Sequence, residues 1–207
     1  MKTFTPSELL VATRNAGKVL EYRALLDALP FRLRTLDEFP AVAEVEETGE
    51  TFAENAALKA GAYAAATRLW TLADDSGLEV DALGGAPGIF SARYGGAGAS
   101  DAERINRLLE ELSGFEAHQR GARFICAIAI ADPEAQIANL STGKCEGRIA
   151  TRPGGAHGFG YDPVFIPEGY ERTFGELPDE IKEKISHRAQ ALAGTRSFLL
   201  KHFGKAP

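Results

Sequence analysis

The chain of 207 residues contains 44% hydrophobic and 25% charged residues, a composition typical of a soluble globular protein. These proportions exclude a disordered, collagen-like or coiled-coil chain. The longest unbroken apolar run, Phe124 to Ala131, has eight residues, against the roughly 20 that a membrane helix needs, so we expect no membrane contact. The formal net charge of −6 repels polyanions and disfavours a nucleic-acid partner. Because no signal-peptide core opens the chain, we expect a cytoplasmic protein.

The first part of the chain predicts strands alternating with helices. Ser7–Thr13 is a short apolar strand, and the residues after it repeat at helical spacing. Phe31–Leu36 alternates like a second strand. The capping box Thr51–Glu54 opens an alanine-rich helix that ends near Arg68. Trp70–Ala73 then predicts a short strand that breaks at the two aspartates that follow it.

The middle of the chain predicts a helix and a hairpin. An irregular connection, Gly84–Gly98, is too rich in glycine for a core element. The capping box Ser100–Glu103 opens a helix through about Leu112. The next two segments, Arg123–Ala131 and Gln136–Thr151, predict an antiparallel hairpin of two long strands.

A second glycine cluster, Pro153–Gly160, leads into a short strand that ends at Ile166, and the last helix is expected to begin near Ser186. The pattern of strands, helices and one hairpin indicates an α/β fold with a mixed sheet. Since we find no repeat and no linker, we expect one domain over residues 1–207.

A turn between the first strand and the first helix is a candidate anion site. Thr13, Asn15 and the backbone N–H groups of residues 16–18 stand at a helix N-terminus, where unpaired donors and the helix dipole favour an anion. The P-loop pattern fails here, since Ala12 and Val19 replace the glycine and hydroxyl residues that it requires. The alternative is an Asn15 cap with a solvated Lys18.

Two acidic pairs predict a site for a hard cation. Glu46 and Glu47 precede a helix, and Asp74 and Asp75 stand at a strand end. Mg²⁺ takes one or two carboxylates and completes its shell with water and phosphate. Because strand side chains alternate, only one of the two aspartates can face a common site. The alternatives are solvated acids, which we expect for Glu47, and a simple Asx turn.

The last third of the chain has features suited to a planar base. Phe159–Asp162 places two aromatic residues beside flexible backbone, and Lys182, His187 and Arg188 add hydrogen-bond donors around the start of the last helix. Ordinary core aromatics and a solvated helix start are the alternatives. Donors from Lys182, His187 or Arg188 could read a base edge that is rich in carbonyl groups.

Taken together, the motifs resemble the inosine/xanthosine triphosphate pyrophosphatase family over nearly the whole chain. The segments that carry the resemblance are ATRNAGKVLE (12–21), EETG (46–49), TFAENA (51–56), DDSGL (74–78), GGAPG (84–88), SARY (91–94), FGYDP (159–163) and SHR (186–188). The resemblance implies a homodimeric, Mg²⁺-dependent hydrolase with a two-lobed α/β fold and an active site in the cleft between the lobes. It also implies that ITP, dITP and XTP are cleaved to the monophosphate and pyrophosphate, which cleanses the nucleotide pool.

The same resemblance implies a role for each matched residue. Glu46 and Asp75 would hold the metal, and Asp75 would also accept the proton of the attacking water. The residues that would touch the substrate are Thr13, Arg14, Asn15, Ala16, Gly17 and Lys18 at the triphosphate, Ser76, and Phe159, Gly160, Tyr161, Asp162, Lys182, His187 and Arg188 at the base.

Two other functions compete with this hypothesis. One is a nucleotide pyrophosphatase with a different base preference, for instance for modified pyrimidines. The other is a sensor that binds a triphosphate and metal without turnover, against which Asp75 beside Glu46 argues, since such a binder needs no base there.

Overall fold

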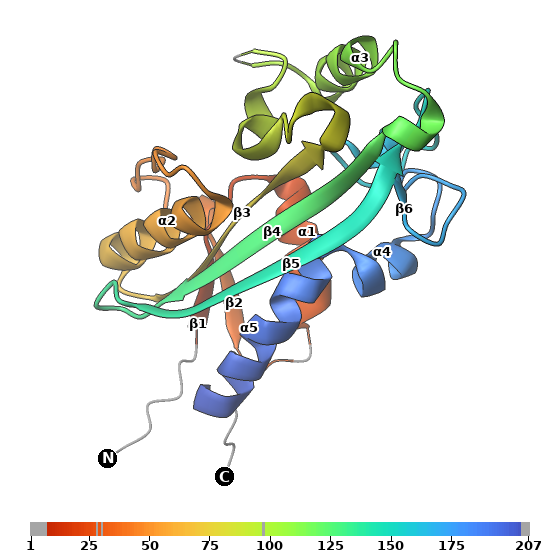
Figure 1. The fold of residues 1–207 in the computed structure, drawn as a ribbon. Coiled ribbons are helices and arrows are strands. Elements are labelled where there is room, and N and C mark those ends of the chain that lie inside the picture. Colours follow the sequence, from red (N-terminus) through yellow and green to blue (C-terminus); the bar gives the residue numbers. More distant parts are fainter. Residues whose placement is uncertain (1–7, 28, 30, 97, 204–207) are drawn as a thin grey trace. The chain divides into compact units, whose positions relative to one another are not determined.

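The computed structural model describes residues 8–203 except 28, 30 and 97, and contains a six-stranded mixed sheet flanked by helices (Figure 1). The strands are β1 (Glu8–Val11), β2 (Arg32–Thr35), β3 (Trp70–Val80), β4 (Gly121–Ala131), β5 (Ile137–Ile149) and β6 (Phe165–Pro167). Their order is β2-β1-β3-β4-β5-β6. β1 is parallel to β2 and β3, whereas β5 and β6 are antiparallel, which confirms the predicted mixed α/β sheet.

Five α-helices accompany the sheet in the described part of the chain. They are α1 (Ala16–Leu26), α2 (Phe52–Thr67), α3 (Asp101–Glu111), α4 (Asp179–Ile185) and α5 (His187–Phe203). Both predicted capping boxes are confirmed, because Thr51 and Ser100 accept hydrogen bonds from the backbone N–H of Glu54 and Glu103. Among the described residues, no helix combines the length and apolar character needed to cross a membrane.

The structure differs from the sequence prediction at β3. This strand does not break at Asp74 but continues to Val80. It lies between β1 and β4 in the sheet, and the buried side chains of Leu78 and Val80 extend its apolar pattern, so pairing and burial outweigh the turn preference of the aspartates. Helix α4 was not predicted, and Ser7, the expected first strand residue, lies outside the described part.

The contacts divide the chain into two compact units. The first contains the described residues up to Asp75, together with Cys126–Gly143 and the residues from Arg188 onward. The second contains Ser76–Ile125 and Lys144–His187. Strands β3, β4 and β5 therefore contribute residues to both units, and β4 and β5 form the long hairpin predicted from the sequence (Figure 1).

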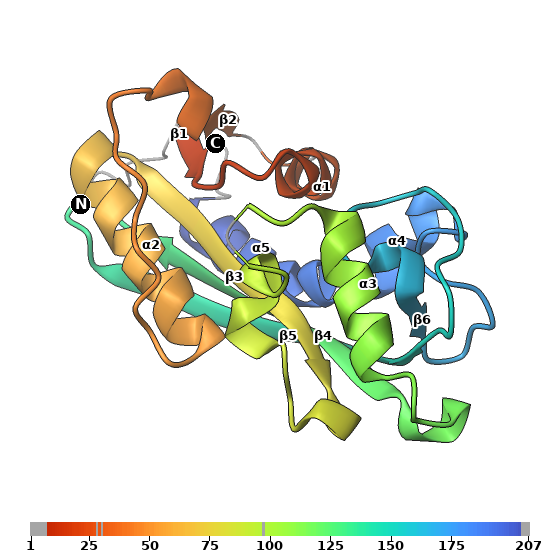
Figure 2. The ribbon, with the colours of Figure 1, turned by 90° about the horizontal axis from the view of Figure 1, so that it is seen from above.

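The core of the first unit forms between its strands and the helices α1 and α5. Its buried residues are Leu9, Val11, Tyr22, Leu26, Leu29, Leu72, Cys126, Ile128, Ile130, Ala191, Leu192 and Leu199. Helix α2 runs alongside β3, as Figure 2 shows, and its buried side chains include Asn55 and Lys59. The polar residues Asn55 and Lys59 thus lie on the packed side of a helix.

The core of the second unit is richer in aromatic residues. The ring of Phe124 packs at a tilt against that of Phe165, with centroids 4.5 Å apart, and stacks with that of Phe174 at 6.4 Å. The apolar face of α3 completes this core with Ile105 and Leu108, both buried. This packing supports the loop at residues 159–162, whose Tyr161 belongs to the same core.

Candidate active site

The turn between β1 and α1 is a capped helix start. Asn15 Oδ1 accepts a hydrogen bond of 3.0 Å from the backbone N–H of Lys18, and Thr13 Oγ1 accepts one of 3.2 Å from that of Asn15. The exposed Arg14 donates to the carbonyl of Val42, 2.8 Å away, in the loop that leads to the acidic pair. The first N–H groups of α1 have no acceptor within the helix and can bind an anion.

Lys18 is not solvated, contrary to the alternative considered from the sequence. Its side chain is 14% exposed, and Nζ lies 2.8 Å from Asp74 Oδ2. The same oxygen accepts a hydrogen bond of 3.2 Å from Arg188 and a weak one of 3.8 Å from the Cys126 thiol. Burial raises the pKa of Asp74, but the attraction of Lys18 and Arg188 outweighs it, so the pKa is well below its usual value.

Asp75, the next residue of β3, has different partners. Its Oδ2 accepts a hydrogen bond of 3.2 Å from Asn55, and its Oδ1 lies 3.1 Å from Lys59 Nζ. Burial raises the pKa of Asp75, with repulsion by Glu47 adding to it, and the attraction of Lys59 only partly opposes them. A carboxylate with a raised pKa is a suitable proton acceptor.

Glu47 belongs to this group, so the prediction that it is solvated is wrong. Its Oε1 lies 2.5 Å from Lys59 Nζ, and its side chain is 28% exposed. Glu46, the predicted metal ligand, is exposed beside it. Burial lowers the pKa of Lys59, but attraction by Asp75, Asp74 and Glu47 outweighs this effect and raises it.

Asn55 and Lys59 were missed as site residues in the sequence. They stand four residues apart and therefore on one face of α2. Both are buried, and the other buried residues of the helix are the alanines 56, 60 and 64 and the aromatic residues Phe52 and Tyr63. A polar pair at helical spacing in an otherwise apolar helix was the available signal.

The carboxylates of Glu47 and Asp75 have the oxygen chemistry that a hard divalent cation prefers. The carboxylates of Glu47 and Asp75 both bind the ammonium of Lys59, which shows that their oxygens converge on one positive charge. Within the described ranges, no three His, Cys, Asp or Glu side chains form a metal-binding cluster. An oxygen site with one or two carboxylates suits Mg²⁺ that takes its other ligands from water and phosphate.

In the second unit, Asp162 organises the predicted base-binding loop. Its Oδ2 accepts a hydrogen bond of 2.8 Å from the backbone N–H of Phe159 and another of 2.5 Å from Lys182 Nζ. Lys182 Nζ also lies 4.6 Å from the centre of the Phe159 ring. A Cβ atom at Gly158 would lie 2.0 Å from Asp162 Oδ2, so only glycine permits this loop.

The two aromatic residues of this loop differ in burial. Tyr161 is 5% exposed and donates a hydrogen bond of 3.0 Å to the carbonyl of Ser91, so it is a core residue. Phe159 is half-buried. Gly160 is held by a hydrogen bond of 2.7 Å from its N–H to Asp101. Phe159 is therefore the better platform for a planar ligand.

The remaining predicted residues do not form one group of donors. The His187 ring is buried in the second unit and stacks on Phe124 at 4.7 Å. Arg188 belongs to the first unit, is 1% exposed, and binds Asp74 and Glu21. Its guanidinium is thus bound to carboxylates, unlike the base-reading donor predicted from the sequence. Ser76 follows Asp75 on β3 and is half-buried.

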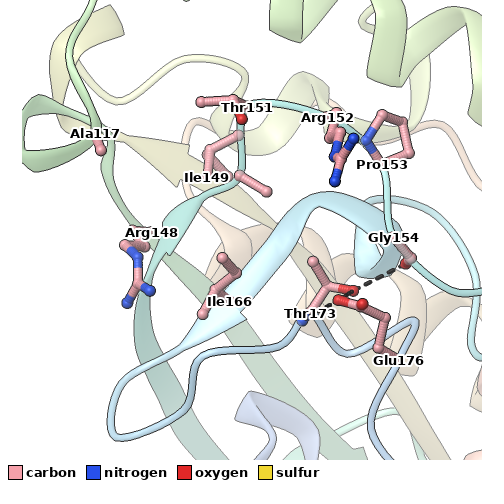
Figure 3. A pocket seen from close by; sticks show the side chains of 11 residues that line it. Ala117, Arg148, Ile149, Thr151, Arg152, Pro153, Gly154, Ile166, Thr173 and Glu176 are labelled. Carbon is pink, nitrogen blue, oxygen red and sulfur yellow. Dashed lines mark hydrogen bonds between the residues drawn. The ribbon is translucent and has the colours of Figure 1, made fainter.

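A separate pocket of about 330 Å³ lies in the second unit (Figure 3). Its lining consists of Ala117, Arg148, Ile149, Ala150, Thr151, Arg152, Pro153, Gly154, Ile166, Thr173 and Glu176. Thr173 Oγ1 donates a hydrogen bond of 2.9 Å to the carbonyl of Gly154 at one wall. Phe159 and Lys182 do not line it, so this pocket is distinct from the predicted base-binding residues.

Comparison with known proteins gives a consistent result. The model of the Ham1 family matches residues 9–198. A protein of Halalkalibacterium halodurans named dITP/XTP pyrophosphatase is 48% identical over 185 residues, which cover 89% of this chain and 95% of the relative. One of the same name from Nostoc sp. is 51% identical over 185 residues, covering 89% of this chain and 90% of the relative.

Solved structures show the same likeness. A HAM1 protein from Coxiella burnetii superposes with a TM-score of 0.84 at 43% identity, covering 94% of this chain and 98% of the other. A structure from Mycobacterium abscessus, described as a nucleoside-triphosphatase or dITP/XTP pyrophosphatase, gives a TM-score of 0.72 at 42% identity, with 91% and 97% covered.

Proposed function

The chain belongs to the Ham1 family, and on that premise we propose that it hydrolyses ITP, dITP and XTP to the nucleoside monophosphate and pyrophosphate. The observation that carries the proposal is the pair of adjacent carboxylates on β3, one bound to Lys18 at a helix start and the other to Lys59. Relatives named dITP/XTP pyrophosphatase support the substrate class. Removing such nucleotides would keep deaminated purines out of DNA and RNA.

The helix start of α1 would bind the triphosphate. A nucleoside triphosphate carries about four negative charges near neutral pH, and its hydrolysis requires that this charge be neutralised. Lys18 and the first N–H groups of α1 offer positive charge and donors at one place. Thr13 and Asn15 shape this turn through their hydrogen bonds.

Asp75 would accept the proton of the attacking water. Its raised pKa favours proton acceptance, and Asn55 and Lys59 hold its two oxygens in place. We propose Mg²⁺ as the cofactor, with Asp75 and Glu46 as ligands, and Glu47 as the competing ligand because it lies beside Lys59. When bound, the metal neutralises charge on the triphosphate. Pyrophosphate is then a good leaving group, so no covalent nucleophile is required.

Lys182 would read the base. Asp162 fixes its ammonium above the ring of Phe159, so donor and stacking platform are held together. A 6-carbonyl accepts a hydrogen bond from this donor, whereas the 6-amino group of adenine does not. The backbone of residues 160–162 and of the His187–Arg188 segment completes the proposed base contacts.

The decisive experiment measures pyrophosphate release from ITP, XTP, GTP and ATP with and without Mg²⁺. We expect turnover of ITP and XTP, little turnover of ATP, and complete loss of activity in EDTA. Binding of ITP without hydrolysis would instead identify a sensor, and preference for a modified pyrimidine would identify a related pyrophosphatase.

Three further properties form part of the proposal. The resemblance supports a homodimer, and we propose a cytoplasmic location and residues 1–207 as one catalytic domain. Light scattering coupled to gel filtration tests the dimer, because a monomer has half the mass.

A separate experiment identifies the second metal ligand. It compares the Mg²⁺ dependence of activity in the variants Glu46→Gln and Glu47→Gln.

A further inference from the structure

The first unit contains a buried charge network centred on Asp74, a residue to which the proposed function assigns neither a substrate contact nor a chemical step. One carboxylate oxygen, Oδ2, lies 2.8 Å from Lys18 Nζ and 3.2 Å from an amino group of Arg188. Lys18 stands in the first turn of α1, and Arg188 in the first turn of α5. A single oxygen on β3 therefore binds the beginnings of two helices.

Glu21 adds a second link between α1 and Arg188. Arg188 also binds Glu21, which lies three residues after Lys18 and hence on the same side of α1. Asp74 is 2% exposed and Arg188 1% exposed, so water competes little for the bond between them. These ion pairs connect α1 to β3 and α5.

Lys18 is the member of the network whose side chain the proposed function assigns to the triphosphate. Its ammonium has three N–H donors, of which Asp74 accepts one. The side chain remains 14% exposed, so its tip can still reach a ligand. A flexible lysine loses rotamer entropy when it binds a phosphate, and a lysine already held in place loses less.

We propose that Asp74 is a positioning residue, which holds the Lys18 ammonium where the triphosphate binds, and that Arg188 in turn holds Asp74. This inference rests on the proposed function, because it requires Lys18 to contact the triphosphate. Asp74 acts through Lys18 and does not touch the reacting atoms. The side chain of Arg188 accordingly acts at the phosphate end of the substrate, whereas only the backbone of this residue is a proposed base contact.

A double-mutant cycle between Asp74→Asn and Lys18→Met tests the coupling. In the wild-type background, Asp74→Asn should raise the KM for ITP and weaken tripolyphosphate binding by on the order of 10-fold. In the Lys18→Met background, the same change should alter both by less than about 3-fold, because the residue it positions is gone. Equal factors in the two backgrounds would show a merely structural role and overturn the proposal.

Asp132→Asn is the matched control, since Asp132 caps the turn between β4 and β5 in the same unit. It should leave KM and tripolyphosphate binding unchanged. Tripolyphosphate has no base and is measured by calorimetry without turnover. Absence of ITP hydrolysis by the wild-type protein would therefore refute the proposed function while the binding cycle still reports on Asp74.

A measurement on the wild-type protein decides the matter if Asp74→Asn does not fold. Nitrogen-15 NMR of the lysine ammonium groups, with Lys18 assigned by its loss in Lys18→Met, reports their proton exchange. Lys18 should exchange slowly, and remain slow with tripolyphosphate, compared with the exposed Lys144. Exchange of Lys18 as fast as that of Lys144 would show that Asp74 does not hold it.

Discussion

Two adjacent residues of β3 carry the same carboxylate but lie in opposite environments. Asp74 is surrounded by Lys18 and Arg188, and its pKa is lowered, whereas Asp75 lies beside α2 with a raised pKa. Because strand side chains alternate, one strand presents a carboxylate of lowered pKa on one face and a carboxylate of raised pKa on the other. The two residues are of the same type, so the difference between their pKa values comes from the helices that each side chain faces.

The number of cations explains the difference. Asp74 has two close cations, whose attraction exceeds the effect of burial. Within the described residues, Asp75 forms an ion pair with Lys59 alone, which it shares with Glu47, so burial and repulsion prevail over the attraction. Changing either set of partners should therefore change one aspartate without the other.

The largest expected effect is that of Asp75→Asn. The amide cannot accept the proton of the attacking water, so kcat for ITP should fall by on the order of 10³-fold while tripolyphosphate binding changes little. Pyrophosphate release and calorimetry give the two values. Asp74→Asn is the comparison, and it should act mainly on binding. Near-normal turnover by Asp75→Asn would show that Asp75 is not the proton acceptor.

Lys59→Met should have the next largest effect. It removes the cation between Glu47 and Asp75 and leaves two carboxylates in repulsion, which should lower the free energy of unfolding by about 3 kcal/mol and kcat by on the order of 10²-fold. Urea unfolding and steady-state kinetics measure these changes. Lys59→Arg, which retains the charge, should recover most of the stability. A stable Lys59→Met protein would contradict the pairing.

Substitutions of Lys182 and Arg188 should affect the specificity for ITP over ATP differently. Lys182→Ala should lower kcat/KM for ITP by on the order of 10- to 100-fold and for ATP by much less, because it removes the donor that distinguishes them. Arg188→Lys should lower both by the same factor, since ITP and ATP share the triphosphate. The measurement is kcat/KM for both nucleotides. A loss of kcat/KM for ITP alone in Arg188→Lys would show that the Arg188 side chain contacts the base.

The smallest effect concerns Cys126, which is buried beside Asp74. Burial, followed by the charge of Asp74, raises the pKa of this thiol to about 12. Above about pH 9 the unfolded thiol loses its proton while the folded one keeps it, so the unfolded state binds fewer protons and stability falls as pH rises. Relative to Cys126→Ala, the wild-type protein should lose about 1.4 kcal/mol more stability between pH 9 and 10. Parallel stability curves for the two proteins would contradict this assignment.

The elements that depend on local sequence were predictable. The capping boxes at Thr51 and Ser100 and the hairpin of β4 and β5 are encoded by neighbouring residues, and the structure confirms them. The mixed sheet followed from the same pattern of strands. The family resemblance, drawn from motifs along the chain, is confirmed by the family model over residues 9–198.

The interactions that depend on distant residues were not predictable. The continuation of β3 requires pairing with strands far away in the sequence, so the aspartates appeared to end it. The direction of the Arg188 side chain depends on Glu21 and Asp74, more than 100 residues away in the chain. Lys59 was overlooked because its partners, Glu47 and Asp75, come together only through the packing of α2.

The alanines of α2 limit how far this protein can vary. Ala56, Ala60 and Ala64 repeat every fourth residue and have no exposed surface. Because their side chains are small, this stripe of α2 packs close to its neighbours. Lys59 and Asn55 reach Asp75 from that short distance. A larger side chain in the stripe would strain the packing by roughly 1–3 kcal/mol and displace the helix. Substitution in α2 is thus restricted at alanines that do not contact Asp75, because they set the distance from which Asn55 and Lys59 reach it.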